Sequence, residues 1–278
     1  MNIFEAVVLG IVEGLTEFLP VSSTGHLTIT EKLLGLKVDS PDVTAFTAII
    51  QTGAILAVVI YFWKDIVRLV AGFVRGLFSG EARREFDFKF AWYVIAGSVP
   101  IAVVGLLFKD QIEGVLRSLW FVAAALIGWS VVMIFAERAA TQQKHEQDLT
   151  LKDVLIIGVA QCIALIPGVS RSGATISAGL LRDLDRVTAT RLSFFLGIPA
   201  LTAAGLLEAV KEFKKISDGV GWGNTAIATL VSFVVAYASV AWLLKFVAHH
   251  SIVTFVWYRV AVGVILIGLL AGGVITAT

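Results

Sequence analysis

Charge and cysteine are both scarce in this sequence. Only 15% of its 278 residues are charged and the formal net charge is +1, so no basic surface for a nucleic acid is indicated. The single cysteine, Cys162, excludes an internal disulfide framework. The first residues carry Glu5 and no lysine or arginine, whereas a secretory signal peptide begins with positive charge, so we expect the mature chain to begin at Met1.

Apolar residues are abundant instead. They make up 58% of the chain, and the mean hydropathy is +0.89. Because so much apolar surface has no place in water, the composition indicates an all-α polytopic membrane protein. Six stretches come close to the length of about 20 apolar residues that a transmembrane helix needs, namely 43–62, 91–108, 119–136, 191–207, 225–246 and 255–275.

Two further apolar regions, residues 3–35 and 153–182, are each interrupted. The first breaks at Pro20 and the second at Pro167, and a Ser/Thr/Gly cluster and a second short apolar run follow each proline. Broken backbone at membrane depth is tolerated only where protein or a water-filled cavity satisfies its polar groups. We therefore predict two re-entrant helical hairpins.

The hairpins are predicted to enter the membrane from opposite faces. Basic loops, of which the amphipathic segment 63–90 is the largest, favour an orientation with both termini outside. Three spans separate the hairpins, so residues 1–136 and 153–278 form two inverted repeats of one membrane domain. The polar residues 137–152 join them as a solvated linker.

Internal similarity agrees with this division. An offset of 148 residues pairs Ser22 with Ser170 and Gly25 with Gly173. In inverted-repeat membrane proteins the broken elements of both halves meet near the midplane and form the binding site. We therefore expect the polar clusters of the two hairpins to meet in one site that handles an anion.

Two acids open the first cluster. Glu13 and Glu17 are four residues apart, so a helix places both on one face. Carboxylates this close repel each other unless a cation or a proton lies between them, and they suit a divalent cation that also binds substrate phosphate. A structural basic partner is the alternative, but residues 1–31 contain no lysine or arginine.

The residues after Pro20 offer a nucleophile and a base. Ser22 lies in a Gly/Ser-rich turn that can direct backbone N–H groups at an anion. His26 follows Ser23 by three residues, close enough for a base and nucleophile pair. The alternative is that the serines cap a helix and His26 is a packed side chain.

Arg171 dominates the second cluster. Its guanidinium stays charged and forms a rigid fork that suits phosphate. Ser170, Ser172 and Thr175 surround it and are expected to help bind the substrate. At membrane depth an arginine needs an anionic partner, which is either the substrate phosphate or Glu13 or Glu17 across the repeat interface.

Other polar residues in apolar stretches can have a functional or a purely structural role. Gln51 and Gln161 either line the site or join helices by hydrogen bonds. Arg259 is expected to be an interfacial anchor at the start of the last span. Gly268 and Gly272 suit tight helix contact within the chain or in a homodimer.

The two clusters carry a resemblance that covers essentially the whole chain. Residues 13–26 (EGLTEFLPVSSTGH) and 167–177 (PGVSRSGATIS) resemble the undecaprenyl pyrophosphate phosphatase family of the bacitracin-resistance type. The resemblance implies a multi-pass phosphatase of the bacterial inner (cell) membrane, often dimeric, that depends on a divalent cation. It places the acidic motif at Glu13 and Glu17, and the remaining functional residues at Ser23, His26 and Arg171.

On this reading the substrate is a polyprenyl pyrophosphate lipid, and the product recycles the carrier of peptidoglycan synthesis, with bacitracin acting indirectly by sequestering the substrate. Arg171 and its serines hold the pyrophosphate, the acids place Mg²⁺ or Ca²⁺, and Ser23 attacks with His26 as base. Attack by water or by His26 itself needs the same residues. The lipid tail stays in the membrane, and the head group enters from the outer, periplasmic side.

Three rival functions are weighed. A transporter or flippase of the same lipid shares the inverted-repeat architecture. A type 2 phosphatidic acid phosphatase needs a second histidine soon after its Ser-Arg pair, and the next histidine after Arg171 is His249, so we reject it. A structural scaffold gives no reason for charged side chains in lipid.

Overall fold

The computed structural model describes residues 1–38, 40–108, 111, 116, 118–211 and 219–277. For residues 204 and 206–211 it describes the backbone only. The regular elements of these residues are all helices, and none is a β-strand. Its elements are α1 (Ile3–Thr16), α2 (Ser23–Leu33), α3 (Pro41–Tyr61), α4 (Trp63–Phe78), η1 (Ala82–Arg84), α5 (Phe86–Leu107), α7 (Leu119–Ala139), η3 (Glu146–Asp148), α8 (Leu151–Gln161), η4 (Cys162–Leu165), α9 (Arg171–Leu180), α10 (Arg186–Lys211), α12 (Trp222–Val247) and α13 (Val253–Ala271).

Five of the described helices are long and apolar enough to cross a membrane, namely α3, α5, α7, α12 and α13. They confirm five of the six expected spans and the all-helical polytopic class. The last span ends at Ala271 rather than at residue 275, because Gly273 takes a φ of 67° that a helix cannot continue. The remaining expected span, 191–207, lies within α10, which is not among the five.

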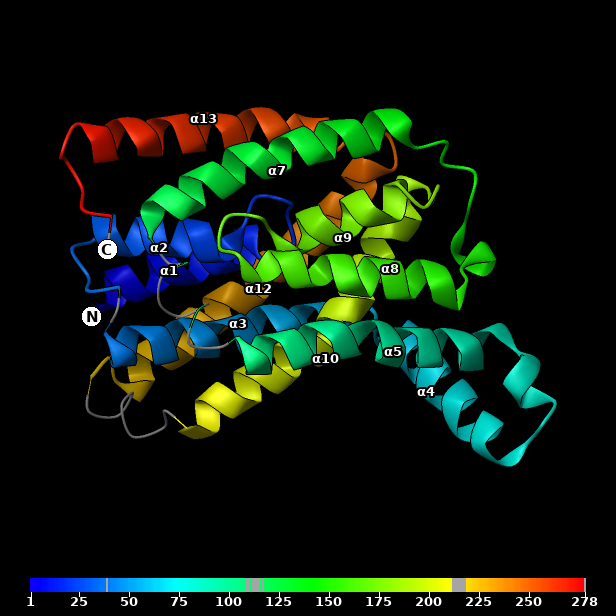
Figure 1. Cartoon of the computed structure of the whole chain (residues 1–278). Coiled ribbons are helices and arrows are strands. Elements are labelled where there is room, and N and C mark those ends of the chain that lie inside the picture. The colour runs from blue at the N-terminus through cyan, green and yellow to red at the C-terminus, as the bar shows by residue number, and fades with distance from the viewer. Residues whose placement is uncertain (39, 109–110, 112–115, 117, 212–218, 278) are drawn as a thin grey trace.

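The helices lie side by side in three layers (Figure 1). α7 and α13 pack together on one side, and α3, α5, α10 and α12 form the other. The two predicted hairpins, α1–α2 and α8–α9, lie between these layers, with both irregular breaks inside the bundle rather than at its ends. Both chain termini lie at one end of the bundle, and α4 and the residue 140–150 connection lie at the other.

Both hairpins restart their second helix in the same way. Ser22 and Ser170 are the N-caps of α2 and α9, and each has a φ of 78°. Each hydroxyl accepts a hydrogen bond from the N–H of the glycine three residues later, Gly25 at 3.4 Å and Gly173 at 3.1 Å. A side chain at either glycine would meet the capping serine at 3.2–3.3 Å, so these tight turns favour glycine there.

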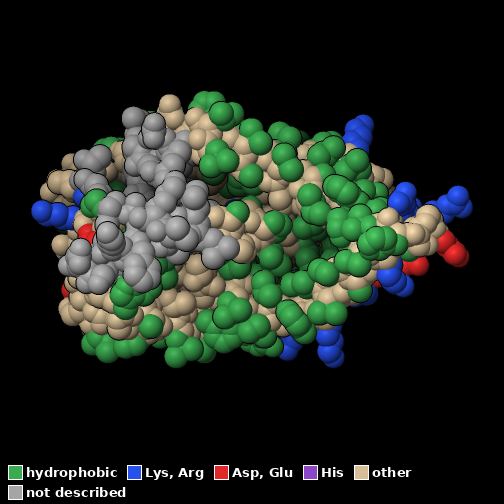
Figure 2. Space-filling view, turned by 90° about the horizontal axis from the view of Figure 1, so that it is seen from below, with side chains coloured by type: hydrophobic (Ala, Val, Ile, Leu, Met, Phe, Trp, Pro, Cys, Tyr) green, Lys and Arg blue, Asp and Glu red, His purple; other side chains and the backbone are tan. Residues whose placement is uncertain are grey.

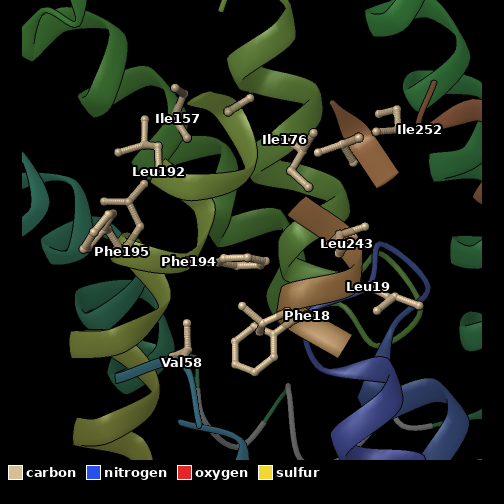
Figure 3. Packing of buried hydrophobic residues seen from close by; sticks show 14 of the residues in the cluster. Phe18, Leu19, Val58, Ile157, Ile176, Leu192, Phe194, Phe195, Leu243 and Ile252 are labelled. Atoms are coloured by element: carbon tan, nitrogen blue, oxygen red, sulfur yellow. The ribbon is translucent and has the colours of Figure 1, made fainter. Parts of the chain in front are cut away.

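An aromatic and aliphatic core supports the break of the first hairpin (Figure 3). Phe18 is 1% exposed and meets Phe194 of α10 edge to face, with ring centroids 5.2 Å apart. Burying an aromatic ring of this size stabilises a fold by a few kcal/mol, about 1.5–3. The contact fixes the backbone next to Glu17 against α10.

The solvated linker between the halves is also held by ion pairs. Lys144 and Arg182 both bind the fully buried Asp153 at the start of α8, at 3.4 and 2.7 Å. Arg191 of α10 bridges Glu146 and Asp65 at 2.9 and 3.3 Å. Most residues of the linker are exposed, as expected for a solvated loop, and these ion pairs to α4, α8 and α10 hold it in place.

The amphipathic helix predicted in segment 63–90 is present as α4. Its exposed apolar side chains recur at helical spacing along one face, namely Trp63, Val67, Val70, Val74, Leu77 and Phe78. Figure 2 shows apolar side chains over much of the lower face of the molecule and basic side chains that project mainly at one end. The surface is that of a protein surrounded by lipid, with its charges at the ends of the helices.

Candidate functional site

A cavity of about 190 Å³ lies between the first hairpin and α3. On α2 its polar lining recurs every three or four residues, and α3 presents a matching stripe, so one face of each helix forms the wall. The lining residues are Glu13, Ser23, Thr24, Leu27, Thr28, Glu31, Val38, Thr44, Thr47, Ala48 and Gln51. Among the predicted site residues, Glu13, Ser23 and Gln51 line this cavity.

Glu17 joins three separate elements beside the cavity, two of them through the lining residues Ser23 and Gln51. Its Oε2 accepts a short hydrogen bond of 2.6 Å from the Ser23 hydroxyl and another of 3.3 Å from the Gln51 amide. Its Oε1 lies 3.3 Å from Nη2 of Arg171 on the second hairpin. The two hairpins therefore meet through a charged pair, as the sequence predicts.

This charged pair is almost completely shielded from solvent. The side chain of Glu17 is 4% exposed and that of Arg171 is 8% exposed. Removing one member of such a pair leaves a buried charge without its counterion, which typically costs about 3–5 kcal/mol. A guanidinium in such a pair can also bind a phosphate oxyanion in general.

Local contacts aim the Arg171 side chain. Its Nη1 donates to the carbonyl of Ser193 at 2.8 Å, and its guanidinium carbon lies 5.9 Å from the ring centre of Phe18. A Cβ on Gly197 would lie 2.3 Å from Nη1, so only glycine leaves room for the guanidinium here. Nε of Arg171 has no hydrogen-bond partner among the described residues, which leaves one donor for a ligand.

Glu13 lies one turn before Glu17 and is 1% exposed. Neither of its carboxylate oxygens has a hydrogen-bond partner in the described part of the chain. An isolated buried carboxylate is costly, so this site calls for a proton or a cation. No group of three or more His, Cys, Asp or Glu residues placed to hold a metal occurs among the described residues. Glu13 and Glu17 fit a hard cation whose other ligands are water and phosphate oxygens.

Four predicted substrate-binding residues do not line the cavity; two of them join the hairpins and two bond within the second hairpin. Ser22 accepts the N–H of Gly168 at 3.0 Å, and Ser172 donates to the carbonyl of Leu19 at 2.9 Å, so each hydroxyl binds the opposite hairpin. Ser170 caps α9 and lies 3.1 Å from the Ser172 hydroxyl. The Thr175 hydroxyl donates to the carbonyl of Arg171 at 2.8 Å and is fully buried.

His26 does not contact Ser23 in the way that the sequence spacing suggests. Its Nδ1 lies 2.8 Å from the carbonyl oxygen of Ser22. Its Nε2 lies 2.8 Å from the hydroxyl of Tyr258 on α13. Ser23 donates to Glu17 instead, so the structure offers a carboxylate, and not this imidazole, as the acceptor of the serine proton.

The prediction that Arg259 is an interfacial anchor is wrong. The side chain is fully buried and donates to the backbone carbonyls of Pro20 at 3.0 Å and Gly168 at 2.9 Å, and to the Ser130 hydroxyl at 3.1 Å. Pro20 belongs to the first break and Gly168 to the second. Arg259 therefore satisfies backbone oxygens of both breaks, whose irregular backbone leaves them without helical partners.

Sequence reasoning missed much of the wall of the cavity. Thr24, Thr28 and Glu31 recur at helical spacing on α2, and Thr44 and Thr47 precede Gln51 on α3 at the same kind of spacing. That polar periodicity within apolar helices was the available signal. Gln161 is fully buried, and its amide lacks a partner among the described residues, so the structure favours neither reading of it.

Comparison with known proteins gives a consistent result. A family model described as "Bacitracin resistance protein BacA" matches residues 6–265. Undecaprenyl-diphosphatase 3 of Frankia casuarinae is 60% identical over 278 residues, with 100% of both chains covered. The undecaprenyl-diphosphatase of Cutibacterium acnes is 55% identical, also with 100% of both chains covered. That of Mycobacterium sp. (strain KMS) is 46% identical over the full length of both.

Proposed function

The chain belongs to the BacA bacitracin resistance family, and we propose that it is a membrane phosphatase that hydrolyses undecaprenyl pyrophosphate to undecaprenyl phosphate and inorganic phosphate. The observation that carries this proposal is the junction at Glu17, where a serine hydroxyl, an arginine and a carboxylate meet beside a cavity. Full-length relatives with 46–60% identity are named for this activity. The product recycles the lipid carrier of peptidoglycan synthesis, which gives resistance to bacitracin, an antibiotic that sequesters the substrate.

The chemistry follows from the contacts of Ser23. We propose that its Oγ attacks the terminal phosphorus while its proton passes to Glu17, to which it already donates at 2.6 Å. The bond between this phosphorus and the bridging oxygen breaks, undecaprenyl phosphate leaves, and water then hydrolyses the phosphoserine. In-line phosphoryl transfer needs chiefly positioning and neutralisation of charge. Direct attack by water on the diphosphate is the alternative within the same site.

Arg171 and a divalent cation would supply the neutralisation. The guanidinium has an unpartnered Nε, is oriented by the Ser193 carbonyl and has space beside Gly197, so it is ready to bind phosphate oxygens. Glu13, with both oxygens unpartnered, and Glu17 would hold Mg²⁺ or Ca²⁺. When bound, the cation neutralises charge that develops on the phosphoryl oxygens.

We further propose that the cavity opens on the outer, periplasmic side of the bacterial inner membrane. The termini lie at the end of the bundle to which α2 leads, and α4 and the charged linker lie at the other. Basic residues favour the cytoplasmic side, which supports this orientation. The isoprenoid tail would then stay in lipid while the diphosphate enters between α2 and α3.

We also propose that α10 is the sixth span and that α1–α2 and α8–α9 are re-entrant hairpins of two inverted repeats. The matching caps at Ser22 and Ser170 support the repeat, since both adopt the same unusual φ at equivalent positions.

A homodimer through α13 is supported by Gly268, where an added Cβ would meet nothing within 4 Å.

The test of this function is phosphate release from C55 pyrophosphate by the purified protein in detergent. A phosphatase turns the substrate over without a membrane, whereas a flippase of the same lipid releases no phosphate. Purified protein that binds the lipid but releases no phosphate at any divalent-cation concentration would contradict the proposed function.

Chelation tests the role of the acids. We expect EDTA to abolish phosphate release, added Mg²⁺ or Ca²⁺ to restore it, and Glu13→Gln to raise the cation concentration needed for half-maximal activity by at least about tenfold. Glu81→Gln, at an exposed site in the loop after α4, is the matched control and should behave as wild type. Full activity in EDTA would show that phosphate release needs no divalent cation at Glu13 and Glu17.

A further inference from the structure

Tyr258 and His26 form a chain of contacts that ends beside the proposed nucleophile. The Tyr258 hydroxyl lies 2.8 Å from Nε2 of His26, and Nδ1 of the same ring lies 2.8 Å from the carbonyl oxygen of Ser22. The two rings are nearly parallel, with an interplanar angle of 11° and centroids 5.5 Å apart. Ser22 directly precedes Ser23.

The partners fix the tautomer of His26. A backbone carbonyl can only accept a hydrogen bond, so Nδ1 must carry a proton and donate it to Ser22. A neutral imidazole then has only a lone pair at Nε2, which accepts from the Tyr258 hydroxyl. His26 is 9% exposed, and the buried Arg259 guanidinium follows Tyr258 on the same helix. A second proton on the ring would therefore add a cation to a site that already holds one.

The carbonyl that His26 holds belongs to a strained residue. Ser22 has a φ of 78°, which is unusual for a residue with a side chain and costs about 1–3 kcal/mol. Its hydroxyl accepts the N–H groups of Gly25 and of Gly168 on the other hairpin. The orientation of the Ser22 peptide sets where the backbone of Ser23 begins and hence where its hydroxyl points.

The residue after Tyr258 acts on the same stretch from the other side. Arg259 donates to the carbonyl of Pro20, two residues before Ser22, at 3.0 Å. Two adjacent side chains of α13 therefore hold two points of the break, Arg259 directly at Pro20 and Tyr258 through His26 at Ser22.

We propose that Tyr258 is a positioning residue of the reaction. His26 is likewise a brace, by which we mean a residue that positions Ser23 by holding the Ser22 carbonyl, and it is not the general base. The Tyr258 hydroxyl donates to Nε2 and orients the ring of His26, whose Nδ1–H holds the Ser22 carbonyl. The Ser23 hydroxyl is thereby directed toward Glu17. This inference rests on the proposed phosphatase function for its kinetic consequence. The tautomer of His26 is independent of that function.

The kinetic test uses Tyr258→Phe, which removes the hydroxyl and keeps the ring. We expect kcat for C55 pyrophosphate to fall about tenfold, the usual effect of one lost positioning hydrogen bond, with KM within about twofold of wild type. Tyr237→Phe is the matched control, because Tyr237 lies on α12 and packs against Tyr61 with ring centroids 5.6 Å apart. A wild-type kcat in Tyr258→Phe would overturn the proposal.

His26→Gln separates a brace from a base. Loss of a general base usually lowers the rate by about 10²–10⁴-fold. For a brace we expect a loss similar to that of Tyr258→Phe, about tenfold. A loss above about 100-fold in a variant that melts at the wild-type temperature would restore His26 as the base.

¹⁵N NMR determines the tautomer of the His26 ring without requiring turnover of any substrate. The chain has four histidines, so in protein labelled with ¹⁵N-histidine the signal missing from His26→Gln identifies His26. We expect the Nδ1–H tautomer in wild type, because the Ser22 carbonyl requires it, and a shifted Nε2 signal in Tyr258→Phe, because Nε2 then loses the hydrogen bond that it accepts. An Nε2–H tautomer in wild type would overturn the proposal even in an active enzyme. The expected tautomer in a protein without phosphatase activity would instead reject the proposed function alone.

Discussion

Ser23→Ala is expected to lower the rate of phosphate release by at least about 1,000-fold, because the variant lacks the oxygen that we propose attacks phosphorus. The hydroxyl donates to Glu17 at 2.6 Å and lines the cavity, so the substitution removes a reacting group without emptying a packed core. The rate is best measured with C55 pyrophosphate labelled on the terminal phosphate.

Ser239→Ala is the matched control for this variant. Ser239 is also a buried serine of a membrane helix, and its hydroxyl donates only to the carbonyl of Val235 in its own helix among the described contacts. We expect it to keep wild-type activity. More than about a tenth of wild-type activity in Ser23→Ala would exclude the serine as nucleophile and leave direct attack by water.

Arg171→Lys is expected to have the second largest effect, a loss of about 100- to 1,000-fold in kcat/KM. Lysine keeps the charge but lacks the rigid fork that binds two phosphate oxygens together with the Ser193 carbonyl. Arg75→Lys, at an exposed pair with Glu85 far from the cavity, is the matched control and should be neutral. Activity near wild type in Arg171→Lys would contradict the proposal that the Arg171 guanidinium binds two phosphate oxygens.

The breaks in the hairpins were predictable because prolines leave a strong local signal. Pro20 and Pro167 interrupt apolar runs, and both interruptions appear at the expected place between paired helices. The meeting of Glu17 with Arg171 was predictable for a different reason. Each is a charge at membrane depth, and each therefore needs a partner of opposite sign.

The inner contacts of the site were not predictable because they depend on backbone shape. The φ of 78° at Ser22 directs the chain so that Ser23 meets Glu17, and nothing in the spacing of Ser23 and His26 reveals that turn. The partners of Arg259 are mainly backbone carbonyls, which carry no sequence signal. A charged residue near the end of an apolar run therefore resembled an anchor, although it lies in the centre of the fold.

The two halves differ where the cavity lies, which bears on the choice between phosphatase and transporter. At the offset of 148 residues, the cavity positions Thr28, Thr44, Thr47 and Ala48 correspond to Ile176, Leu192, Phe195 and Leu196. All four of these counterparts are buried in the hydrophobic core, and Figure 3 shows three of them. At these four positions the second half places buried apolar side chains where the first half lines the cavity, so the two halves are not equivalent there.

The central claim is that Glu17 and Arg171, from hairpins far apart in sequence, form one buried pair at 3.3 Å. The most direct test compares the melting temperatures of Glu17→Gln, Arg171→Met and the double variant in the same detergent. Each single change leaves one buried charge without its partner, whereas the double change removes both. We expect the double variant to melt above either single variant. If the two losses in melting temperature simply add, the residues do not share a site and the account is contradicted.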